Sequence, residues 1–457
     1  SQNIYSSRKI EIACKRDINF MWLLAGQKAP DHSTIARFRT GFLLEACEDL
    51  FYQMVRRLKD AAELSVETVF IDGTKLEACA NKYTFVWKKS VGKWEEKMFQ
   101  KIQEAVMLLN HEYMQSFSVK IDSRIQDLQT ITRYLENKCQ QDGTVFVYGR
   151  GKRKSKNQKY FELFRKFQER QVTYDWHTAS FQGRNNYCKT DPDATFMHMK
   201  DDHMRSAQLK PGYNIQIGVD SEYIVATDVF SDRNDVWTLI PFLKTMDEKL
   251  GFRYPSVTAD SGYESEEGYT YLRETRQTPY IKPQTYEKWK RRSFKQDISK
   301  RENMAYDAET DVYTCYAQKK LSPVFVKKQK SKSGYESEVT VYECEDCKDC
   351  PHKEKCTRAK GNKRLYVSKS FLEKRQESYE NILTETGIQY RMNRSIQVEG
   401  AFGVLKNDYE FQKFLLRGKT KVKLEILLLC MGYNLNKLHA KIQNERIGFH
   451  LFKVKSA

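Results

Sequence analysis

The pattern of apolar and polar residues predicts strands in short segments that lie far apart in the chain. Thr68–Ile71 is a β-branched and apolar run that stops on Asp72, as expected of a buried strand that ends at a turn. Tyr213–Val219 and Glu222–Phe230 both have strand character, and only two or three polar residues separate them. This short connection predicts an antiparallel hairpin.

Two helices and two further strands are predicted after the hairpin. Asn234 or Asp235 can cap the helix, whose apolar positions are Val236, Leu239, Ile240, Leu243 and Met246. Within Pro255–Tyr263, a second strand ends on an aspartate, which is Asp260. We expect another helix from about Ser265 and a short strand at Thr278–Ile281.

The order of these elements predicts an α/β fold. Without the long polar stretch that follows Asp72, the order is strand, two hairpin strands, helix, strand, helix and strand. This is the order of a ribonuclease-H-like mixed sheet flanked by helices. The first and fourth strands are neighbours in that fold, so fold analogy places Asp72 beside Asp260. A lone strand-ending aspartate is usually a turn residue. The prediction of a site therefore depends on finding two such aspartates on strands that the fold places side by side.

The N-terminal region is predicted to be helical. Residues 8–46 have helical character with breaks at Gly26–Pro30, and a capping residue precedes an apolar-periodic run that carries Arg37 and Arg39. A helix, a short turn and a helix with basic residues are compatible with a helix-turn-helix DNA-binding module. A plain helical bundle would give the same spacing, and both interpretations stay open at this point.

The polar stretch after the first strand predicts long helices and a basic loop. Two stripes of apolar residues indicate a helical hairpin, a self-associating coiled coil or simply the core faces of packed helices: Phe99, Ile102, Val106 and Leu109, then Ile121, Ile125, Leu128 and Leu135. The run Gly149–Lys159 is basic. A charge run is usually a solvated surface, but Lys152, Arg153 and Lys154 are also candidates for contacts with a phosphate backbone.

The chain carries a large excess of positive charge. The formal net charge is +18 and the pI is near 9.2, which suits a polyanion because Lys and Arg release counterions when they neutralise phosphates. No apolar run approaches the roughly 20 residues of a membrane-spanning helix, and no secretory segment follows Ser1. We therefore expect a soluble, intracellular protein of two or three domains that faces nucleic acid.

Four of the eleven cysteines form a cluster with the spacing C-x2-C-x2-C-x5-C, whereas the others are scattered singly, as suits reduced thiols. The cluster consists of Cys344, Cys347, Cys350 and Cys356. Four thiolates can enclose one tetrahedral zinc, with His352 as an alternative ligand. An iron–sulfur cluster uses the same ligand type.

Basic stretches lie on both sides of the cysteine cluster. The first contains Lys290, Arg291 and Arg292 beside Trp289, and the second is Lys327–Lys332. The indole of Trp289 could stack on an unpaired base, although such a ring more often packs locally.

Two carboxylates at adjacent strand ends repel each other unless a cation lies between them. Magnesium suits this position because it prefers oxygen ligands and often uses only one or two protein carboxylates together with phosphate. A third acidic ligand is expected on a later helix, and the candidate is Glu399, with Arg394 and Lys406 nearby. Two metal ions could then activate an attacking water or hydroxyl and stabilise a leaving 3′ oxygen.

These segments together resemble the DDE transposases of bacterial insertion sequences, specifically the eleven-eighty-two insertion-sequence group. The resemblance covers nearly the whole chain and includes long blocks in the right order. The blocks are Tyr5–Ala13, Ile71–Ser90, Thr190–Met197, Gln208–Gln216, Thr258–Tyr263, Val398–Gly403 and Leu416–Val422.

The resemblance implies that Asp72, Asp260 and Glu399 form the metal-binding catalytic triad. The signature Y-x2-R-x3-E-x6-K of neighbouring transposases fits Glu399 and Lys406, whereas the spacings Tyr390–Arg394 and Arg394–Glu399 are each one residue too long. Lys406 and Arg394 would position phosphates, which carry no base information. The implied cofactors are Mg²⁺ or Mn²⁺, as two ions, and a structural Zn²⁺ in a four-cysteine insertion. ATP is not required.

The implied activity is hydrolysis of phosphodiester bonds at the ends of the element, followed by joining of the freed 3′ hydroxyl ends to target DNA. The partners would be double-stranded DNA, both terminal inverted repeats and target, and a second copy of the chain in a homodimer on DNA, with no membrane. The location would be the bacterial cytoplasm at the nucleoid. The resemblance also implies that the natural chain begins before Ser1.

The predicted domains follow from these assignments. Residues 1–62 are the helical module, residues 63–90, 205–284 and 385–440 the catalytic domain, and residues 91–204 the helical and basic insertion. Residues 285–384 are the zinc-binding insertion and residues 441–457 a C-terminal tail. Two alternatives to an active transposase remain: a transposase-derived DNA-binding protein without catalysis, and a metal-dependent DNA nuclease that cuts without joining.

Overall fold

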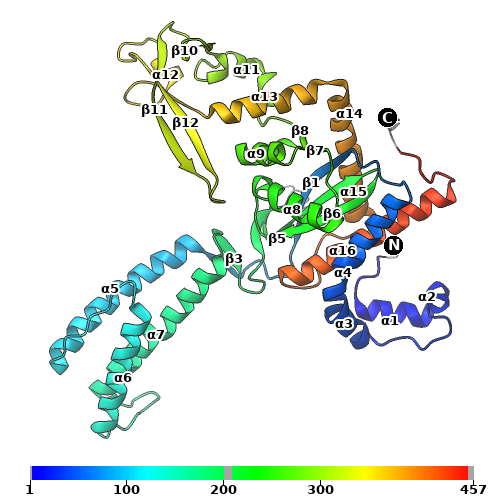
Figure 1. The fold of residues 1–457 in the computed structure, drawn as a ribbon. Coiled ribbons are helices and arrows are strands. Elements are labelled where there is room, and N and C mark those ends of the chain that lie inside the picture. The colour runs from blue at the N-terminus through cyan, green and yellow to red at the C-terminus, as the bar shows by residue number, and fades with distance from the viewer. Residues whose placement is uncertain (1–2, 200–207, 451–457) are drawn as a thin grey trace. The chain divides into compact units, whose positions relative to one another are not determined.

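The computed structural model describes residues 3–199 and 208–450. The chain forms two compact units (Figure 1). Unit 1 comprises residues 1–76, 214–416 and 420–457, and unit 2 comprises residues 77–213 and 417–419. The last seven residues of the predicted tail, and the first three of the predicted catalytic segment 205–284, lie outside the described residues.

A mixed sheet is the centre of unit 1. Its strands run in the order β6-β5-β1-β7-β8, in which β1, β7 and β8 are parallel and β5 and β6 form an antiparallel hairpin. The strands are β1 (Thr68–Glu77), β5 (Leu209–Asp220), β6 (Tyr223–Phe230), β7 (Ser256–Ala259) and β8 (Thr278–Ile281). The hairpin turns at Ser221 and Glu222, whose φ angles are 51° and 72°, because a tight two-residue connection needs left-handed residues.

The predicted end of the first strand at Asp72 is wrong, because β1 continues to Glu77. What ends near Asp72 is the pairing with β7, whose last partners are Ile71 and Ala259. Asp72 and Asp260 are therefore the next residues on two neighbouring parallel strands. The expected adjacency of the two strands is confirmed, and the strand order supplies it.

Helices cover the sheet and bury its apolar side chains. The helix α8 (Leu239–Leu250) packs against β6, α9 (Glu266–Glu274) and α13 (Lys369–Leu383) pack against β8, and α14 (Glu385–Arg394) packs against β7. The helix α16 (Lys419–Gln443) is joined to β6, because the Asn434 amide accepts from the Ile224 N–H and donates to its carbonyl. No helix in the described part of the chain is long and apolar enough to cross a membrane.

Four helices form the N-terminal region: α1 (Ser7–Arg16), α2 (Ile18–Leu23), α3 (His32–Thr40) and α4 (Phe42–Asp60). Asp31 caps α3 by accepting from the Thr34 N–H at 2.7 Å, as the sequence predicts. The helix α4 also packs against β6 and α8, so this region is anchored on the central sheet.

A second, antiparallel sheet carries the cysteine cluster. Its strand order is β13-β12-β11-β10-β9. The strands are β9 (Ala305–Asp307), β10 (Val312–Thr314), β11 (Lys320–Lys330), β12 (Glu336–Cys344) and β13 (Arg364–Val367). Its core contains Tyr313, Leu321, Tyr342 and the buried thiols of Cys344 and Cys347.

Unit 2 is dominated by three helices, α5 (Lys88–Tyr113), α6 (Arg124–Gln141) and α7 (Lys156–Phe181) (Figure 1). Their shared core confirms that the predicted apolar stripes are core faces, and it recruits Phe164 and Phe167 from α7. Ile121 and Ile125 of the second stripe do not belong to this core. Ile121 precedes α6 and is 67% exposed, and Ile125 is half-buried. The short strands β2 (Phe85–Trp87) and β3 (Asn186–Cys188) pair with each other, and β4 (Thr195–His198) pairs with residues 209–212.

Several short elements complete the fold. They are the helices α10 (Tyr286–Trp289), α11 (Arg292–Lys295), α12 (Lys353–Cys356) and α15 (Gly400–Gly403), the 3₁₀ turns η1 (Asp235–Trp237), η2 (Ser261–Tyr263) and η3 (Arg301–Asn303), and the π-helical turns η4 (Ser395–Glu399) and η5 (Val404–Asp408).

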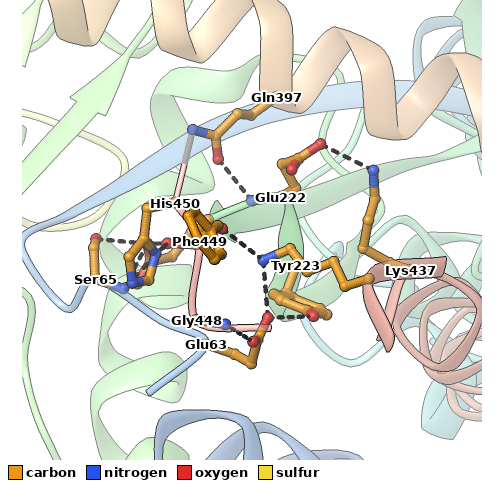
Figure 2. A network of polar contacts seen from close by, with 12 residues as sticks. Glu63, Ser65, Glu222, Tyr223, Gln397, Lys437, Gly448, Phe449 and His450 are labelled. Atoms are coloured by element: carbon orange, nitrogen blue, oxygen red, sulfur yellow. Dashed lines mark hydrogen bonds and ion pairs between the residues drawn. The ribbon is translucent and has the colours of Figure 1, made fainter. Parts of the chain in front are cut away.

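A buried ion pair fixes the C-terminal helix to the start of the sheet. Glu63 is fully buried and accepts from Lys441 Nζ at 2.8 Å, from the Tyr223 hydroxyl at 2.7 Å and from the Gly448 N–H at 2.5 Å (Figure 2). Burial acts to raise the pKa of Glu63, but the hydrogen bonds and the charge of Lys441 outweigh it and hold the pKa below its usual 4.5. Removing one partner of such a pair leaves an uncompensated buried charge.

We expect Lys441→Met to reduce the free energy of unfolding by about 3–5 kcal/mol. Lys437→Met is the matched control on the same helix, because Lys437 pairs with Glu222 at 3.0 Å and keeps 30% of its surface exposed. It should cost at most about 1 kcal/mol. Urea unfolding followed by circular dichroism measures both variants, and equal losses would contradict the special role of Glu63.

The Glu63–Lys441 pair also predicts how the stability of the protein depends on pH. The pKa of Glu63 is lower in the folded than in the unfolded chain, so its stabilisation is present above the unfolded pKa and disappears as the pH falls through the folded pKa. The difference in stability between wild type and Lys441→Met should therefore shrink in acid.

Candidate active site

Asp72 and Asp260 form the centre of the candidate site. Asp72 Oδ1 accepts from the Gly73 N–H at 2.8 Å, and Asp260 Oδ1 accepts from the Gly262 N–H at 2.7 Å. Each carboxylate is therefore oriented by a backbone N–H close after it in the chain, within β1 for Asp72 and in the turn Ser261–Tyr263 for Asp260. The predicted pair is brought together by the parallel register of β1 and β7.

The electrostatics of Asp72 show that this site is short of positive charge. Burial raises the pKa of Asp72 above its usual 3.8, Arg394 lowers it, and the neighbouring Asp260 raises it again. The net direction is upward, so one guanidinium does not offset burial and repulsion together. A divalent cation would remove this imbalance.

Arg394 links the first and third predicted ligands. Its Nη1 lies 3.0 Å from Asp72 Oδ2, and its Nη2 lies 3.8 Å from Glu399 Oε1. The Glu399 side chain is 61% exposed, whereas those of Asp72 and Arg394 are mostly covered. Arg394 thus takes the counter-ion position beside Asp72.

The π-helical turn η4 explains why Arg394 is one residue out of the expected spacing. Arg394 and Glu399 are five residues apart, and η4 spans Ser395–Glu399 between them. In a π-helix, residues five apart lie on one face, whereas an α-helix with 3.6 residues per turn would separate them. The extra residue is accommodated in the backbone, so Arg394 still reaches Glu399.

Tyr390 does not share this arrangement. Its ring packs edge-on against Phe70 and Tyr280 at 6.0 and 5.0 Å between centroids, so the structure places it in apolar packing. Lys406 is half-buried on the second π-helical turn, η5.

Asp235 is a third aspartate near the pair. The sequence predicts it as a possible helix cap, but α8 begins later and neither Asn234 nor Thr238 makes a side-chain cap. Asp235 Oδ1 instead accepts from the side-chain amides of Asn214 at 2.7 Å and Gln216 at 3.1 Å. Both amides lie on β5, and this alternation of polar residues in a buried strand was the signal that could have revealed it.

The aspartates surround a buried phenol. The Tyr263 hydroxyl donates to Gln216 Oε1, and burial together with the charges of Asp235, Asp72 and Asp260 raises the pKa of Tyr263 well above its usual value. Asp235 therefore belongs to the same electrostatic neighbourhood as the predicted pair.

The glycines that follow both aspartates are required by the same crowding. A Cβ at Gly73 would lie 2.3 Å from Gln216 Nε2 and 3.0 Å from Asp235 Oδ1. A Cβ at Gly262 would lie 2.9 Å from Asp260 Oδ1 and 3.4 Å from Asp235 Oδ2. The sequences Asp-Gly and Asp-Ser-Gly thus leave room for the Gln216 amide beside Gly73 and for the Asp260 carboxylate beside Gly262.

The predicted DNA-contacting residues differ in exposure. Arg37 is exposed, whereas Arg39 is half-buried and its charge lowers the pKa of Glu425, which burial raises. In unit 2, Lys152 and Arg153 are exposed, whereas Lys154 pairs with Glu162. The structure therefore leaves Arg37, Lys152 and Arg153 better placed for a partner than Arg39 and Lys154.

The basic residues next to Trp289 also differ in whether they pair within the protein. Arg291 and Arg292 are exposed, and Lys290 pairs with Glu287 at 3.2 Å. Trp289 packs edge-on against Tyr379 at 5.4 Å and lies under Arg375 at 5.2 Å. The structure therefore confirms that this indole packs locally, as such a ring more often does.

The cysteine cluster has a member that the spacing did not include. All eleven cysteines are free thiols. Cys315 lines the same cavity of about 20 Å³ as Cys344, Cys347, Cys350, His352 and Cys356. The Lys363 N–H donates to Cys347 Sγ at 3.4 Å. Cys315 follows β10, about 30 residues before the cluster, so only the antiparallel sheet brings it there.

Neither predicted metal site is a closed ligand cage. Within residues 3–199 and 208–450, no three His, Cys, Asp or Glu side chains are grouped so that they could hold a metal ion. The chemistry of the Asp72–Asp260 pair still suits magnesium, because this ion commonly takes one or two protein carboxylates and completes its shell with water and phosphate. Glu399 would have to leave Arg394 to join it.

Two family models match parts of the chain. Residues 314–439 match the model described as transposase DDE domain, and residues 1–41 match the one described as transposase domain (DUF772). The first range contains Arg394 and Glu399, and the second contains Arg37. A search of curated proteins and a search of solved structures found no match. The two matches support a DDE transposase, a class of protein that acts on DNA.

The raised pKa of Asp72 gives a stability prediction. The folded pKa lies above the unfolded one, so the stabilising contribution exists at low pH and is lost as the pH rises through the folded pKa. In EDTA at neutral pH, Asp72→Asn should therefore raise Tm, and the gain should vanish in acid. The control is Asp232→Asn on an exposed position, which should leave Tm unchanged. A lower Tm for Asp72→Asn would show that the lost ion pair with Arg394 outweighs burial.

Proposed function

We propose that this protein is a DDE transposase of an insertion sequence, which cuts DNA at the ends of its element and joins the 3′ hydroxyl ends to target DNA. The observation that carries the proposal is that Asp72 and Asp260 directly follow the last paired residues of β1 and β7. Arg394 links Asp72 to Glu399. Arg394 and Glu399 lie within the range that matches the transposase DDE domain.

On this proposal, Asp72, Asp260 and Glu399 hold two divalent ions, Mg²⁺ or Mn²⁺. The metal, when bound, would supply activation of the attacking oxygen and stabilisation of the leaving 3′ oxygen. The three carboxylates act as ligands and form no covalent bond with DNA. Arg394, whose Nη1 lies 3.0 Å from Asp72, would contact a DNA phosphate. Lys406 is assigned a phosphate contact as well.

Asp235 is a positioning residue in this scheme. Its Oδ1 accepts from two amides of β5, and Gln216 in turn stands against Gly73. The Asp235 carboxylate therefore fixes the amide that lies against Gly73, the residue after Asp72. Loss of such an outer contact typically reduces metal affinity or activity by about 10–100-fold.

The fold proposal is a ribonuclease-H-like catalytic domain. The strand order β6-β5-β1-β7-β8, with an antiparallel hairpin beside three parallel strands, supports it. The partners proposed are the terminal inverted repeats, target DNA and a second copy of the chain in the DNA complex. The proposed place of action is the bacterial nucleoid in the cytoplasm.

Two other functions use the same residues. A DNA-binding protein without catalysis would bind element ends and never cut them, and a metal-dependent nuclease would cut without joining. The presence of all three acidic residues favours catalysis over the first. A product in which an element end is covalently linked to target DNA would distinguish a transposase from the second.

The first test is cleavage of a duplex that carries the element's own end, with Mg²⁺ or Mn²⁺. We expect nicking at the end by the wild type and none by Asp260→Ala, while both bind the duplex equally. Equal cutting by both proteins would remove Asp260 from the active site. Binding without cutting by either would favour the non-catalytic alternative.

Asp235→Asn tests the positioning role in the same assay. We expect about 10–100-fold slower cutting and a higher metal concentration for half-maximal rate. Asp232→Asn, an exposed aspartate on the same loop, is the matched control and should change neither value. A slower rate with an unchanged metal requirement would assign Asp235 to general stability.

We also propose a structural zinc in the cysteine cluster. The support is a cavity of about 20 Å³ bordered by five thiols and the His352 imidazole, which is enough space for one small ion. Zinc needs four such ligands, so one thiol is spare. Cys344, Cys347, Cys350 and Cys356 remain the predicted set, with Cys315 and His352 as substitutes.

Purified protein should contain one zinc per chain by atomic emission. Cys347→Ser should lose it and destabilise the small antiparallel sheet, because binding energy of a structural zinc is folding energy. Cys79→Ser, a singly placed cysteine, is the control and should retain the metal. Visible absorption typical of iron would favour the iron–sulfur alternative, and metal-free wild type would remove the site.

A further inference from the structure

A basic and aromatic groove runs between α5 and α7 in unit 2. It has a volume of about 430 Å³, and its walls are Trp94, Lys97 and Lys101 from α5 and Arg170, Thr173 and Tyr174 from α7, with Met98 among the lining residues. None of the described residues that line it is acidic. No candidate site identified so far includes these residues.

The three cations of the groove are not neutralised by the protein. Lys97, Lys101 and Arg170 are exposed, and none of them makes an ion pair within the described part of the chain. Lys97 and Lys101 stand one helical turn apart, about 6 Å along the axis, and Arg170 faces them from α7. This arrangement concentrates positive charge along one line and favours an anion with repeated charges.

The nearby acidic residues are held elsewhere. Glu95 pairs with Arg124 of α6 at 2.6 Å and accepts from the Gln171 amide at 2.9 Å. Gln171 also donates to Asp175 at 2.8 Å, and Glu169 pairs with Arg165 at 3.2 Å. These contacts join α5, α6 and α7, and the described residues that line the groove include no acidic side chain.

The aromatic residues add a second kind of recognition. The Trp94 indole is 56% exposed although its neighbour Met98 is buried, and Tyr174 contributes a half-buried ring on the opposite wall. The two rings lie on opposite walls of the same groove that carries the three cations. Cations that follow a backbone, together with rings on which bases stack, are the features of surfaces that bind single-stranded nucleic acid.

We propose that the α5–α7 groove binds a segment of single-stranded DNA, with phosphates at Lys97, Lys101 and Arg170 and one unpaired base on Trp94. A paired base is covered on both faces by its neighbours and cannot offer a face to Trp94, so the aromatic wall favours a single strand over a duplex. This inference names a further binding site and does not require that the Asp72–Asp260 site cut DNA.

The test uses the full chain in EDTA, with a fluorescent oligothymidylate and a duplex of equal length, and follows anisotropy at several salt concentrations. The test variants are Lys97→Gln/Arg170→Gln and Trp94→Ala. The first should lower the slope of log affinity against log salt by about 1.4, since each lost phosphate contact on a single strand removes about 0.7. Trp94→Ala should weaken single-strand binding about tenfold with little change for the duplex.

The matched control is Lys159→Gln/Lys166→Gln, two exposed lysines of α7 that do not line the groove. It removes the same charge and should leave the affinity for the single strand within about twofold of wild type, beyond the general effect of charge. Circular dichroism confirms that each variant keeps its helices.

Three results would overturn the proposal: an equal loss in the control, an unchanged affinity in Trp94→Ala, or competition by thymidine monophosphate as effective as that by the oligonucleotide. Asp260→Ala should bind the oligonucleotide like the wild type. Failure of cleavage therefore leaves this proposal standing, and failure of this binding leaves the catalytic proposal standing.

Discussion

The parallel pairing of β1 with β7 is the constraint on which the candidate site depends. The pairing ends at Ile71 and Ala259, so the next residue on each strand is an aspartate in a crowded, partly buried place. Two carboxylates at this point repel each other and lose hydration. The Arg394 guanidinium beside Asp72 and the N–H groups of Gly73 and Gly262 compensate in part for this repulsion. A Cβ at either glycine would lie 3.0 Å or less from a polar side-chain atom.

The later helix supplies the counter-charge through an unusual backbone. A regular α-helix would place Arg394 and Glu399 on different faces, and the π-helical turn between them restores a common face. A sequence signature with fixed spacing therefore predicts which side chains meet only if the helix has the assumed number of residues per turn. Here the spacing departs by one residue while the side chains still meet.

Positive charge is distributed over separate features of the molecule. The net charge of +18 alone suggested a polyanion partner, but individual cations have different tasks. Lys441 neutralises a buried glutamate, Lys154 pairs with Glu162, and Arg124 holds three helices together. What remains for a partner is the subset without internal pairs, and the α5–α7 groove has three such residues in one place.

Local sequence patterns are enough to predict most of the elements, and they mark Asp72 and Asp260 as candidate ligands. Periodicity gave the hairpin, the helix after Ser265 and the strand at Thr278–Ile281, because burial of one face imposes a period on each element. It misplaced the end of the first strand and did not foresee α7, since polar and charged residues there obscure the period. Only the tertiary structure decided that Asp235 belongs beside Asp72, that Cys315 joins the cysteine cluster and that Arg39 faces Glu425. These are contacts between residues distant in the chain, and no local pattern records them because strand order, register and helix type create them.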